Sequence, residues 1–401
     1  MTAGAMLLLA CVITLVHYTG AYMRVPLLPL YARAHGASPA EVGAIVAAHM
    51  GVAALTAVPF GLASDRWGRA RLLFAGTLVS ALTSFALAAV TTLWALALVY
   101  AAAGLGVAAF TPAMMSLVGD AAEPGAIARA YGWYTTALYA GFGLGPILGG
   151  AAAERWGEPP AFLAAGGITT LALALAAWLP RGPRSPRRAA GGSVRGVLTN
   201  RRILASWVAT VAGIGALGCV LTFFPLLARD RGLGPAAIGL VLGVQALVNT
   251  AIRVPAGWVL DHSRARQPYV LGGILLTGLL IAMLPLARRT EEFLLLAVAV
   301  GLALGVAFVA VGAVLTEATT AATRGAAMGG YSTAIYVGFA AAAFGLGPLM
   351  GTWGYGTGFA VAGGCTAALA AAAAVLGHRS PHRRSRSTSG GAARRNSRAG
   401  E

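Results

Sequence analysis

The chain has 401 residues, of which 58% are hydrophobic and 10% are charged. Soluble domains carry about 25% charged residues, so this composition excludes an ordinary soluble globular protein and a disordered one. The 29 basic residues are all arginine and outnumber the 12 acidic residues, which gives a formal net charge of +17.

Apolar stretches long enough to cross a bilayer recur along the chain. A helix needs about 20 apolar residues to span the hydrocarbon layer, and twelve such stretches are present. We therefore predict an all-α integral membrane fold with twelve transmembrane helices. The predicted spans are 6–34, 40–63, 71–91, 94–118, 129–152, 160–179, 203–228, 236–260, 268–287, 292–316, 326–350 and 355–377.

The arginines gather on one side of these spans. With both termini in the cytoplasm, 21 arginines fall in inner loops and the tail and six in outer loops. Short cytoplasmic loops carry this excess in membrane proteins, so we predict both termini inside, at the cell inner membrane. Residues 180–202 form a predicted basic linker and 378–401 a disordered Arg/Ser-rich cytoplasmic tail. Membrane lipids, not nucleic acid, are the expected partners of this charge.

Two regions align when the sequence is shifted by 196 residues. Residues 25–69 and 221–265 then share 13 identities without a gap, including prolines, glycines, an arginine and an aspartate. Such matches in one register indicate a duplication rather than shared apolar composition. We predict a six-helix bundle in 1–179 and another in 203–377, related by a pseudo-twofold axis, with a substrate site between them.

The turn between the second and third predicted helices carries glycine, aspartate and arginine at fixed spacing. Asp65 can face the positive end of a neighbouring helix, and the arginines can pair with an acid such as Asp120. This loop resembles the signature of the major facilitator superfamily, G-x-x-x-D-R-x-G-R-R. The matching residues are Gly61, Asp65, Arg66, Gly68 and Arg69.

The resemblance implies a fold and a role for this loop. In the family the loop latches the outward-facing conformation, helices one, four, seven and ten line a central cavity, and helices two, five, eight and eleven form the sliding contact. The match departs at Ala70, where a second basic residue is usual and Arg71 is a possible substitute. The second copy keeps Gly257 and Asp261 but carries His262 next to that aspartate.

The fifth predicted helix is rich in glycine. Glycines four residues apart form a groove in which another helix packs closely, and a proline permits a bend. The pattern resembles the antiporter motif of exporters in the superfamily, which favours export. Its residues are Gly132, Gly141, Gly145, Pro146, Gly149 and Gly150.

The predicted membrane interior is basic and polar. Every acidic residue falls in a loop, at a helix end or in the tail, so no carboxylate is available as a mid-membrane proton carrier. A buried arginine tends to face an aqueous cavity or a partner, and a histidine changes charge near working pH. The candidate residues of the substrate and proton pathway are His17, Arg24, His49, Tyr139, Gln245, Asn249, Arg253 and Tyr336. The alternative interpretation is that the arginines snorkel to the headgroups or bond backbone carbonyls, and that the histidines are hydrogen-bonded core residues.

These observations predict a secondary active transporter that exports a small molecule by alternating access in exchange for protons. Uptake or uniport of a small polar or anionic solute is the alternative. A membrane enzyme is not expected, because the H-E-x-x-H and G-x-S-x-G motifs are missing, and a transporter-like sensor needs a flux assay to be excluded. We expect a monomer without cofactor or metal.

Overall fold

The computed structural model describes residues 2–123, 126–179, 194–263, 265–320 and 323–378, and within them all regular secondary structure is helical. Most of the predicted tail and most of the predicted linker lie outside these residues. The α-helices are α1 Ala3–Ala34, α2 Pro39–Trp67, α3 Arg69–Leu87, α4 Leu93–Ala121, α5 Ile127–Trp156, α6 Glu158–Ala176, α7 Val194–Leu198, α8 Arg201–Asp230, α9 Pro235–Asp261, α10 Gln267–Met283, α11 Thr290–Ala318 and α12 Arg324–His378; the 3-10 helix η1, Leu284–Leu286, extends α10.

Eleven of the described helices are long and apolar enough to cross a membrane. One of them, α12, holds two of the predicted spans, which are separated by a kink where Gly354 adopts a φ of 79°. The prediction of an all-α membrane fold with twelve spans is therefore confirmed. The third span is shorter than predicted, because α3 ends at Leu87 and not at residue 91.

Turn glycines reproduce the duplication in the backbone. Gly36 (φ 89°) follows α1, and Gly232 (φ 85°) stands at the equivalent place after α8. Gly157 (φ 85°) and Gly354 (φ 79°) are related in the same way, 197 residues apart. A positive φ favours glycine because a side chain with a Cβ is strained there. The repeat thus fixes where helices end, as well as which residues they contain.

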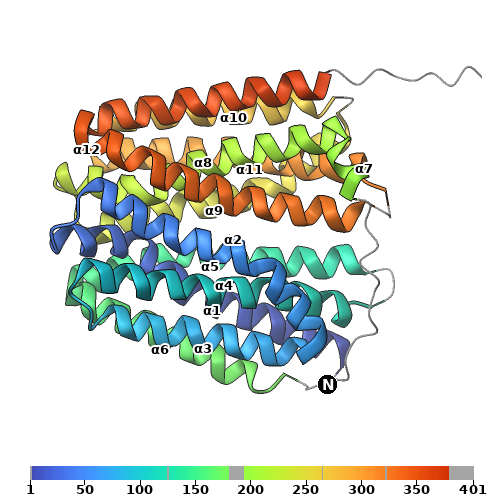
Figure 1. The fold of residues 1–401 in the computed structure, drawn as a ribbon, viewed down its shortest axis with the longest axis horizontal. Helices are drawn as coiled ribbons and strands as arrows, with labels where there is room; N and C mark the ends of the chain where they lie inside the picture. Colours follow the sequence, from blue (N-terminus) through green and yellow to red (C-terminus); the bar gives the residue numbers. More distant parts are fainter. Residues whose placement is uncertain (1, 124–125, 180–193, 264, 321–322, 379–401) are drawn as a thin grey trace, which may run out of the picture.

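The helices form two bundles whose contacts are equivalent (Figure 1). In the first, α1 packs on α5 and α6, α2 on α4, and α3 on α4 and α6. In the second, α8 packs on α12, α9 on α11, and α10 on α11 and α12. Between the bundles, α5 packs on α9 and α2 packs on α12. Exchanging the bundles turns one of these cross-contacts into the other, as a pseudo-twofold axis requires.

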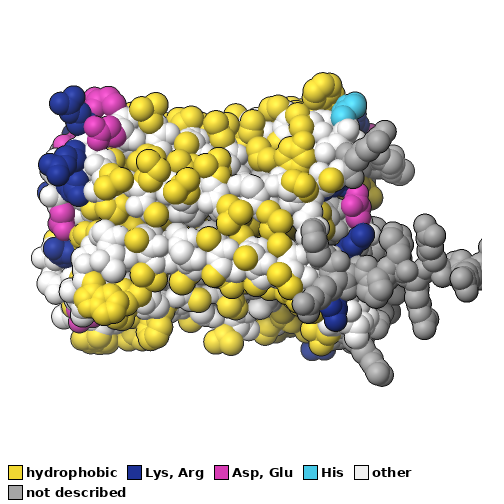
Figure 2. Space-filling view, turned by 90° about the horizontal axis from the view of Figure 1, so that it is seen from above, with side chains coloured by type: hydrophobic (Ala, Val, Ile, Leu, Met, Phe, Trp, Pro, Cys, Tyr) yellow, Lys and Arg dark blue, Asp and Glu magenta, His cyan; other side chains and the backbone are white. Residues whose placement is uncertain are grey.

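The outer surface is suited to lipid. Figure 2 shows hydrophobic side chains over the middle of the molecule and charged side chains at its two ends. Tryptophans that are exposed near helix ends fit the membrane–water interface, where their rings are enriched. They are Trp67, Trp94, Trp133, Trp156, Trp178, Trp258 and Trp353. The chain is therefore a multi-pass membrane protein.

The two ends of the molecule differ in how tightly the bundles meet. We call the end where α1 and α8 begin the terminal end, and the end where they finish the opposite end (Figure 1). Toward the opposite end, every residue of 26–32 in α1 and of 218–228 in α8 is buried. Toward the terminal end, both helices keep exposed or half-buried residues. The two central helices are thus enclosed on all sides only at the opposite end.

Candidate functional site

The glycines of α5 form close contacts with two different helices, α1 and α9. A Cβ on Gly141 or Gly145 would lie within 3.0 Å of α1 atoms, and one on Gly149 would overlap Met23 of α1. A Cβ on Gly150 would overlap the backbone oxygen of Pro235 and lie 3.0 Å from the Cα of Gly239 in α9. Pro146 lies inside α5. Glycine thus lets α5 pack backbone to backbone against its own bundle and against the other one.

Gly132 differs from the other glycines of the motif. No atom lies within 4 Å of the position that its Cβ would take. It belongs to the sequence pattern of α5 but not to either close helix contact.

The second contact between the bundles uses glycine in the same way. In α2, a Cβ on Gly43 would overlap the backbone oxygen of Ala343 in α12. In α12, a Cβ on Gly347 would lie 2.9 Å from the Cα of Ala40. The α2–α12 and α5–α9 contacts are therefore a symmetric pair of close backbone contacts between the bundles. We call these two contacts the seams.

Arg24 of α1 is a buried charge. Only 2% of its surface is exposed. Its Nε donates to the backbone oxygen of Ala21 and its Nη1 to the hydroxyl of Thr83 in α3, both at 3.3 Å. No acidic side chain of the described residues is within ion-pair distance of its guanidinium. The charge is therefore held by two long hydrogen bonds and has no counter-ion.

Two histidines are also buried in the first bundle. His17 of α1 is fully buried, stacks on Phe110 with ring centroids 3.8 Å apart, and has no hydrogen-bond partner for either ring nitrogen. His49 of α2 bonds the carbonyl oxygen of Tyr100 through Nδ1 at 2.8 Å and stacks on that ring at 4.4 Å. The first bundle thus holds three buried basic residues in its interior, Arg24, His17 and His49.

Arg253 of α9 contacts the first bundle. Arg253 donates from Nε and Nη2 to the Oδ1 of Asn249, at 3.2 and 3.1 Å. Its guanidinium carbon lies 3.8 Å from the centre of the Tyr139 ring in α5. Gln245 lies nearer the start of α9, where it lines a small pocket with Val220 and other apolar residues of the second bundle. The structure therefore joins three of the predicted residues and separates Gln245 from them.

Aromatic side chains gather around this contact. Tyr22 of α1 stacks on Phe142 at 3.9 Å, and Tyr139 meets Phe142 edge-on at 5.3 Å. The Tyr18 and Thr111 hydroxyls are 2.7 Å apart, and Tyr336 of α12 interacts with the same threonine. Sequence analysis missed three side chains of this region, because single phenylalanines and threonines in apolar helices carry no pattern. They are Phe110, Thr111 and Phe142.

The signature loop between α2 and α3 lies at the terminal end. Gly68 makes the turn with a φ of 97°, Gly61 has open space around it, and Arg66 is exposed. Arg69 forms an ion pair with Asp120 at the end of α4 and also bonds the backbone oxygen of Ser116. Asp65 belongs to α2, and its side chain lies outside the described part of the structure.

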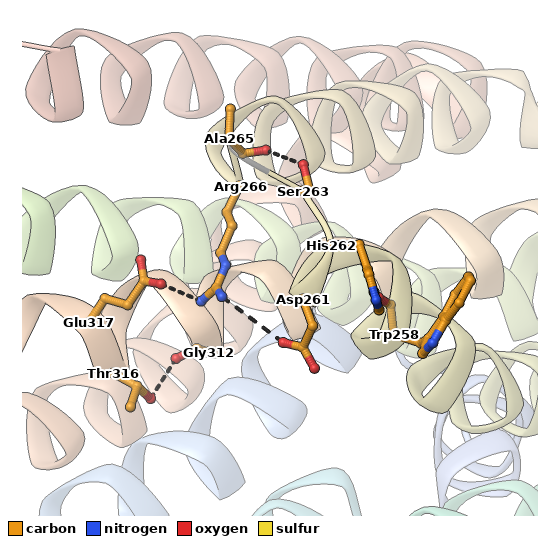
Figure 3. A network of polar contacts seen from close by, with 9 residues as sticks. All are labelled: Trp258, Asp261, His262, Ser263, Ala265, Arg266, Gly312, Thr316 and Glu317. Carbon is orange, nitrogen blue, oxygen red and sulfur yellow. Dashed lines mark hydrogen bonds and ion pairs between the residues drawn. The ribbon is translucent and has the colours of Figure 1, made fainter.

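An equivalent ion pair is present in the second bundle, and sequence analysis missed it. Arg266 pairs with Glu317 of α11 at 2.5 Å and approaches Asp261 at 4.0 Å, so it lies between the two acids (Figure 3). Both Arg266 and Glu317 stand 197 residues after Arg69 and Asp120. The signal was available, because the same offset relates other matching segments of the two halves.

Polar contacts join the bundles at the opposite end, and these too were missed. Arg33 of α1 lies 3.8 Å from Asp230 of α8 and donates to the hydroxyl of Tyr355 at 3.2 Å. The Glu154 carboxylate of α5 accepts from the Ala236 N–H at the start of α9, at 3.2 Å. An acid is favourable at a helix N-terminus. These contacts close the opposite end.

Acidic groups stay away from the centre of the described structure. With Glu401 outside the described residues, each remaining acid lies in a loop or close to a helix end. No group of three or more His, Cys, Asp or Glu side chains among the described residues could hold a metal ion. The centre between the bundles thus combines basic, hydroxyl and aromatic groups.

Comparisons with known proteins agree with this architecture. A family model described as Major Facilitator Superfamily matches residues 10–226 and 206–399. The inner membrane transport protein YajR of Escherichia coli K12 is 28% identical over 349 residues, which cover 83% of this chain and 74% of that protein. The quinolone resistance protein NorA of Staphylococcus aureus MRSA252 is 26% identical over 168 residues, which cover 42% and 43% of the two chains.

Two further facts delimit these similarities. The matched segments span 38 to 74% of the length of the curated relatives. The crystal structure of the nucleoside transporter NupG resembles this chain with a TM-score of 0.78 at 14% identity, over 92% of this chain and 99% of that one. At this identity the likeness shows the fold alone.

Proposed function

The chain belongs to the Major Facilitator Superfamily, and from that premise we propose that it exports a small molecule across the cell inner membrane in exchange for protons. Members of this family are transporters of small molecules and not enzymes, so the predictions of a transporter and of no enzymatic activity are confirmed. Direction, proton coupling and the monomeric state belong to the proposal.

The two symmetric seams are the observation that supports our proposal of alternating access. Bundles that meet through glycine-lined backbone contacts at α5–α9 and α2–α12 can rock against each other, because few side chains must be repacked along a smooth surface. Burial around α1 and α8 is complete only at the opposite end. In our proposal this is the state open toward the terminal end.

The terminal end faces the cytoplasm in our proposal. Apart from Arg24 and Arg253, six arginines stand at or near the ends of helices at the opposite end, whereas the remaining loops and the tail contain 21. Short cytoplasmic loops carry such an excess in membrane proteins. A reporter fused within 180–202 should be active inside the cell. Activity of that reporter outside would reverse the assignment.

Export is favoured by the glycine motif of α5, which resembles that of exporters, and by the relative NorA, whose name is that of a resistance protein. Uptake or uniport of a polar or anionic solute is the second candidate, favoured by Arg24 and Arg253 and by the fold shared with a nucleoside transporter. Expression in cells that lack their own exporters separates the two. Export lowers the intracellular level of a substrate, and uptake raises it.

His17 is the proposed proton site, because its buried ring has two unpartnered nitrogens and the described interior holds no carboxylate. The test is substrate flux in proteoliposomes with an imposed pH gradient. Wild-type flux should follow the pH gradient. The variant His17→Phe should keep the ring stack on Phe110, but its flux should no longer depend on the pH gradient. Flux that ignores both the pH gradient and the membrane potential would refute coupling. A protein that binds solute without any flux would be a sensor.

A further inference from the structure

Arg253 and Arg24 break the repeat, whereas the residues around them follow it. At the offset of 196, Arg253 corresponds to Ala57 and Arg24 corresponds to Val220. Tyr139 and Tyr336, in contrast, correspond to each other at the offset of 197 that relates α5 to α12. A buried arginine is expensive in a membrane helix. Each bundle therefore contains a costly charge that the duplicated fold does not require.

The guanidinium of Arg253 is held in place at the surface between the bundles. Asn249 accepts hydrogen bonds from Nε and Nη2, and the guanidinium lies over the Tyr139 ring of the other bundle. Its remaining nitrogen, Nη1, has no hydrogen-bond partner among the described residues. A snorkelling arginine would extend toward the headgroups, but these contacts direct this one inward, about 12 Å before the end of α9.

The surroundings of Arg253 are aromatic and part open. Tyr22, Tyr139, Phe142 and Tyr336 are all half-buried, and they come from α1, α5 and α12. Tyr139 contacts α9 and Tyr336 contacts α4, so both face across the interface between the bundles. Flat rings offer stacking surfaces to another flat ring. A guanidinium beside them offers paired donors that match a carboxylate.

We propose that Arg253, held in position by the Tyr139 ring, binds the carboxylate of an aromatic organic anion whose own ring lies against Tyr22 and Phe142. This inference rests on the transport function proposed above and names the substrate class of that site. The nearest central charges are Arg24 and Arg253, without an acid among the described interior residues, so a cationic solute would meet repulsion. Arg24 is sealed in this state and Arg253 is half-buried, which makes Arg253 the first arginine that a solute reaches.

The test uses three probes with the same ring and different charge: 1-naphthoate, 1-naphthamide and protonated 1-naphthylmethylamine. Binding to the full-length protein in nanodiscs is measured by equilibrium dialysis. We expect 1-naphthoate to bind best. Arg253→Gln should weaken its binding by about tenfold or more, as the loss of a charge-assisted hydrogen bond implies. Arg253→Lys should retain part of the affinity.

Matched variants separate the site from general effects of charge and folding. Arg155→Gln removes an exposed arginine at the end of α5 and should bind 1-naphthoate as wild type does. Tyr139→Phe should keep the affinity, because the ring face remains, whereas Tyr139→Leu should lower it. Unchanged melting without ligand shows that each variant is folded.

Two results would overturn the inference: tighter binding of the amine than of 1-naphthoate, or wild-type binding of 1-naphthoate by folded Arg253→Gln. Transport of a cationic dye without any binding of 1-naphthoate would also reject it, while leaving the transporter function intact. If 1-naphthoate binding depends on Arg253 but no flux occurs in proteoliposomes, the proposed transport would be rejected and the inferred binding site would still stand.

Discussion

Arg24 is a buried charge that its surroundings compensate only in part. Its charge is almost fully buried, yet it has only two hydrogen bonds of 3.3 Å and no acidic partner. Desolvation of an arginine in a membrane helix is only partly offset by such contacts. Neither local helix formation nor packing explains why this position carries a charge.

We therefore expect Arg24→Met to raise the thermal stability of the purified protein, by up to about 3 kcal/mol, and to reduce transport. Methionine fills similar volume without a charge to desolvate. Arg155→Met, at an exposed site, should change neither quantity. Melting curves in detergent measure the effect. A clear loss of stability in Arg24→Met would mean that Arg24 is a structural residue.

At the scale of helices, the seams depend on the absence of side chains. Gly150 and Gly239 let α5 and α9 approach until no Cβ fits between them. The same helix carries Gly132, which has open space around it. The two positions therefore offer the same substitution with opposite expected outcomes.

Gly150→Ala should destabilise the protein by about 1–3 kcal/mol, as overpacking of a tight contact does, and should slow transport. Gly132→Ala should be neutral or stabilise α5 by about 0.5–1 kcal/mol, because alanine favours a helix over glycine. Thermal melting and flux in proteoliposomes check both. Equal effects of the two substitutions would show that close approach at Gly150 is unimportant.

The ion pairs Arg69–Asp120 and Arg266–Glu317 connect each signature loop to the helix end beside it. They stand at equivalent places in the two bundles, so the duplication preserved an interaction whose sequence context changed. Both acids are half-exposed, which limits the contribution of each pair to stability.

Reversal of one partner, as in Glu317→Arg, should reduce stability by about 0.2–1 kcal/mol, and exchange of both partners should restore it. Asp261→Asn is the control, because that acid is more exposed and lies 4.0 Å from Arg266. The measurement is a double-mutant cycle on melting. Additive effects of the two reversals would mean that the pair is not coupled.

For the whole molecule, the closed opposite end is the feature that must open in the alternating access proposed above. The contacts Arg33–Asp230, Arg33–Tyr355 and Glu154–Ala236 join the bundles there. Cys219 lies in the enclosed part of α8 with no exposed surface, so it reports whether that end has opened.

In a protein with Cys11→Ser and Cys365→Ser, Cys219 should react slowly with a hydrophilic thiol reagent. Adding Arg33→Ala and Glu154→Ala should speed the reaction by about tenfold, which corresponds to about 1.4 kcal/mol in the conformational equilibrium. Arg155→Ala is the control. An unchanged rate, with unchanged melting, would show that these contacts do not hold the end closed.

Much of the architecture could be predicted from the sequence, because the physics behind it is local or repeats along the chain. Span number follows from runs of apolar residues that must cross lipid, and turn glycines follow from the backbone angles that they allow. The duplication follows from residue identities at one offset. Even Arg266–Glu317 could be found at the neighbouring offset of 197.

The candidate site was decided only by tertiary structure. Hydropathy does not define how a helix rotates about its axis, so it could not tell that Arg253 meets Tyr139 while Gln245 turns into the second bundle. It could not place Phe142 or Thr111 beside the tyrosines, or Arg33 beside Asp230, because these contacts join residues far apart in the chain. The sequence by itself determined which groups the membrane interior contains, and the packing of the two bundles decided which of them meet.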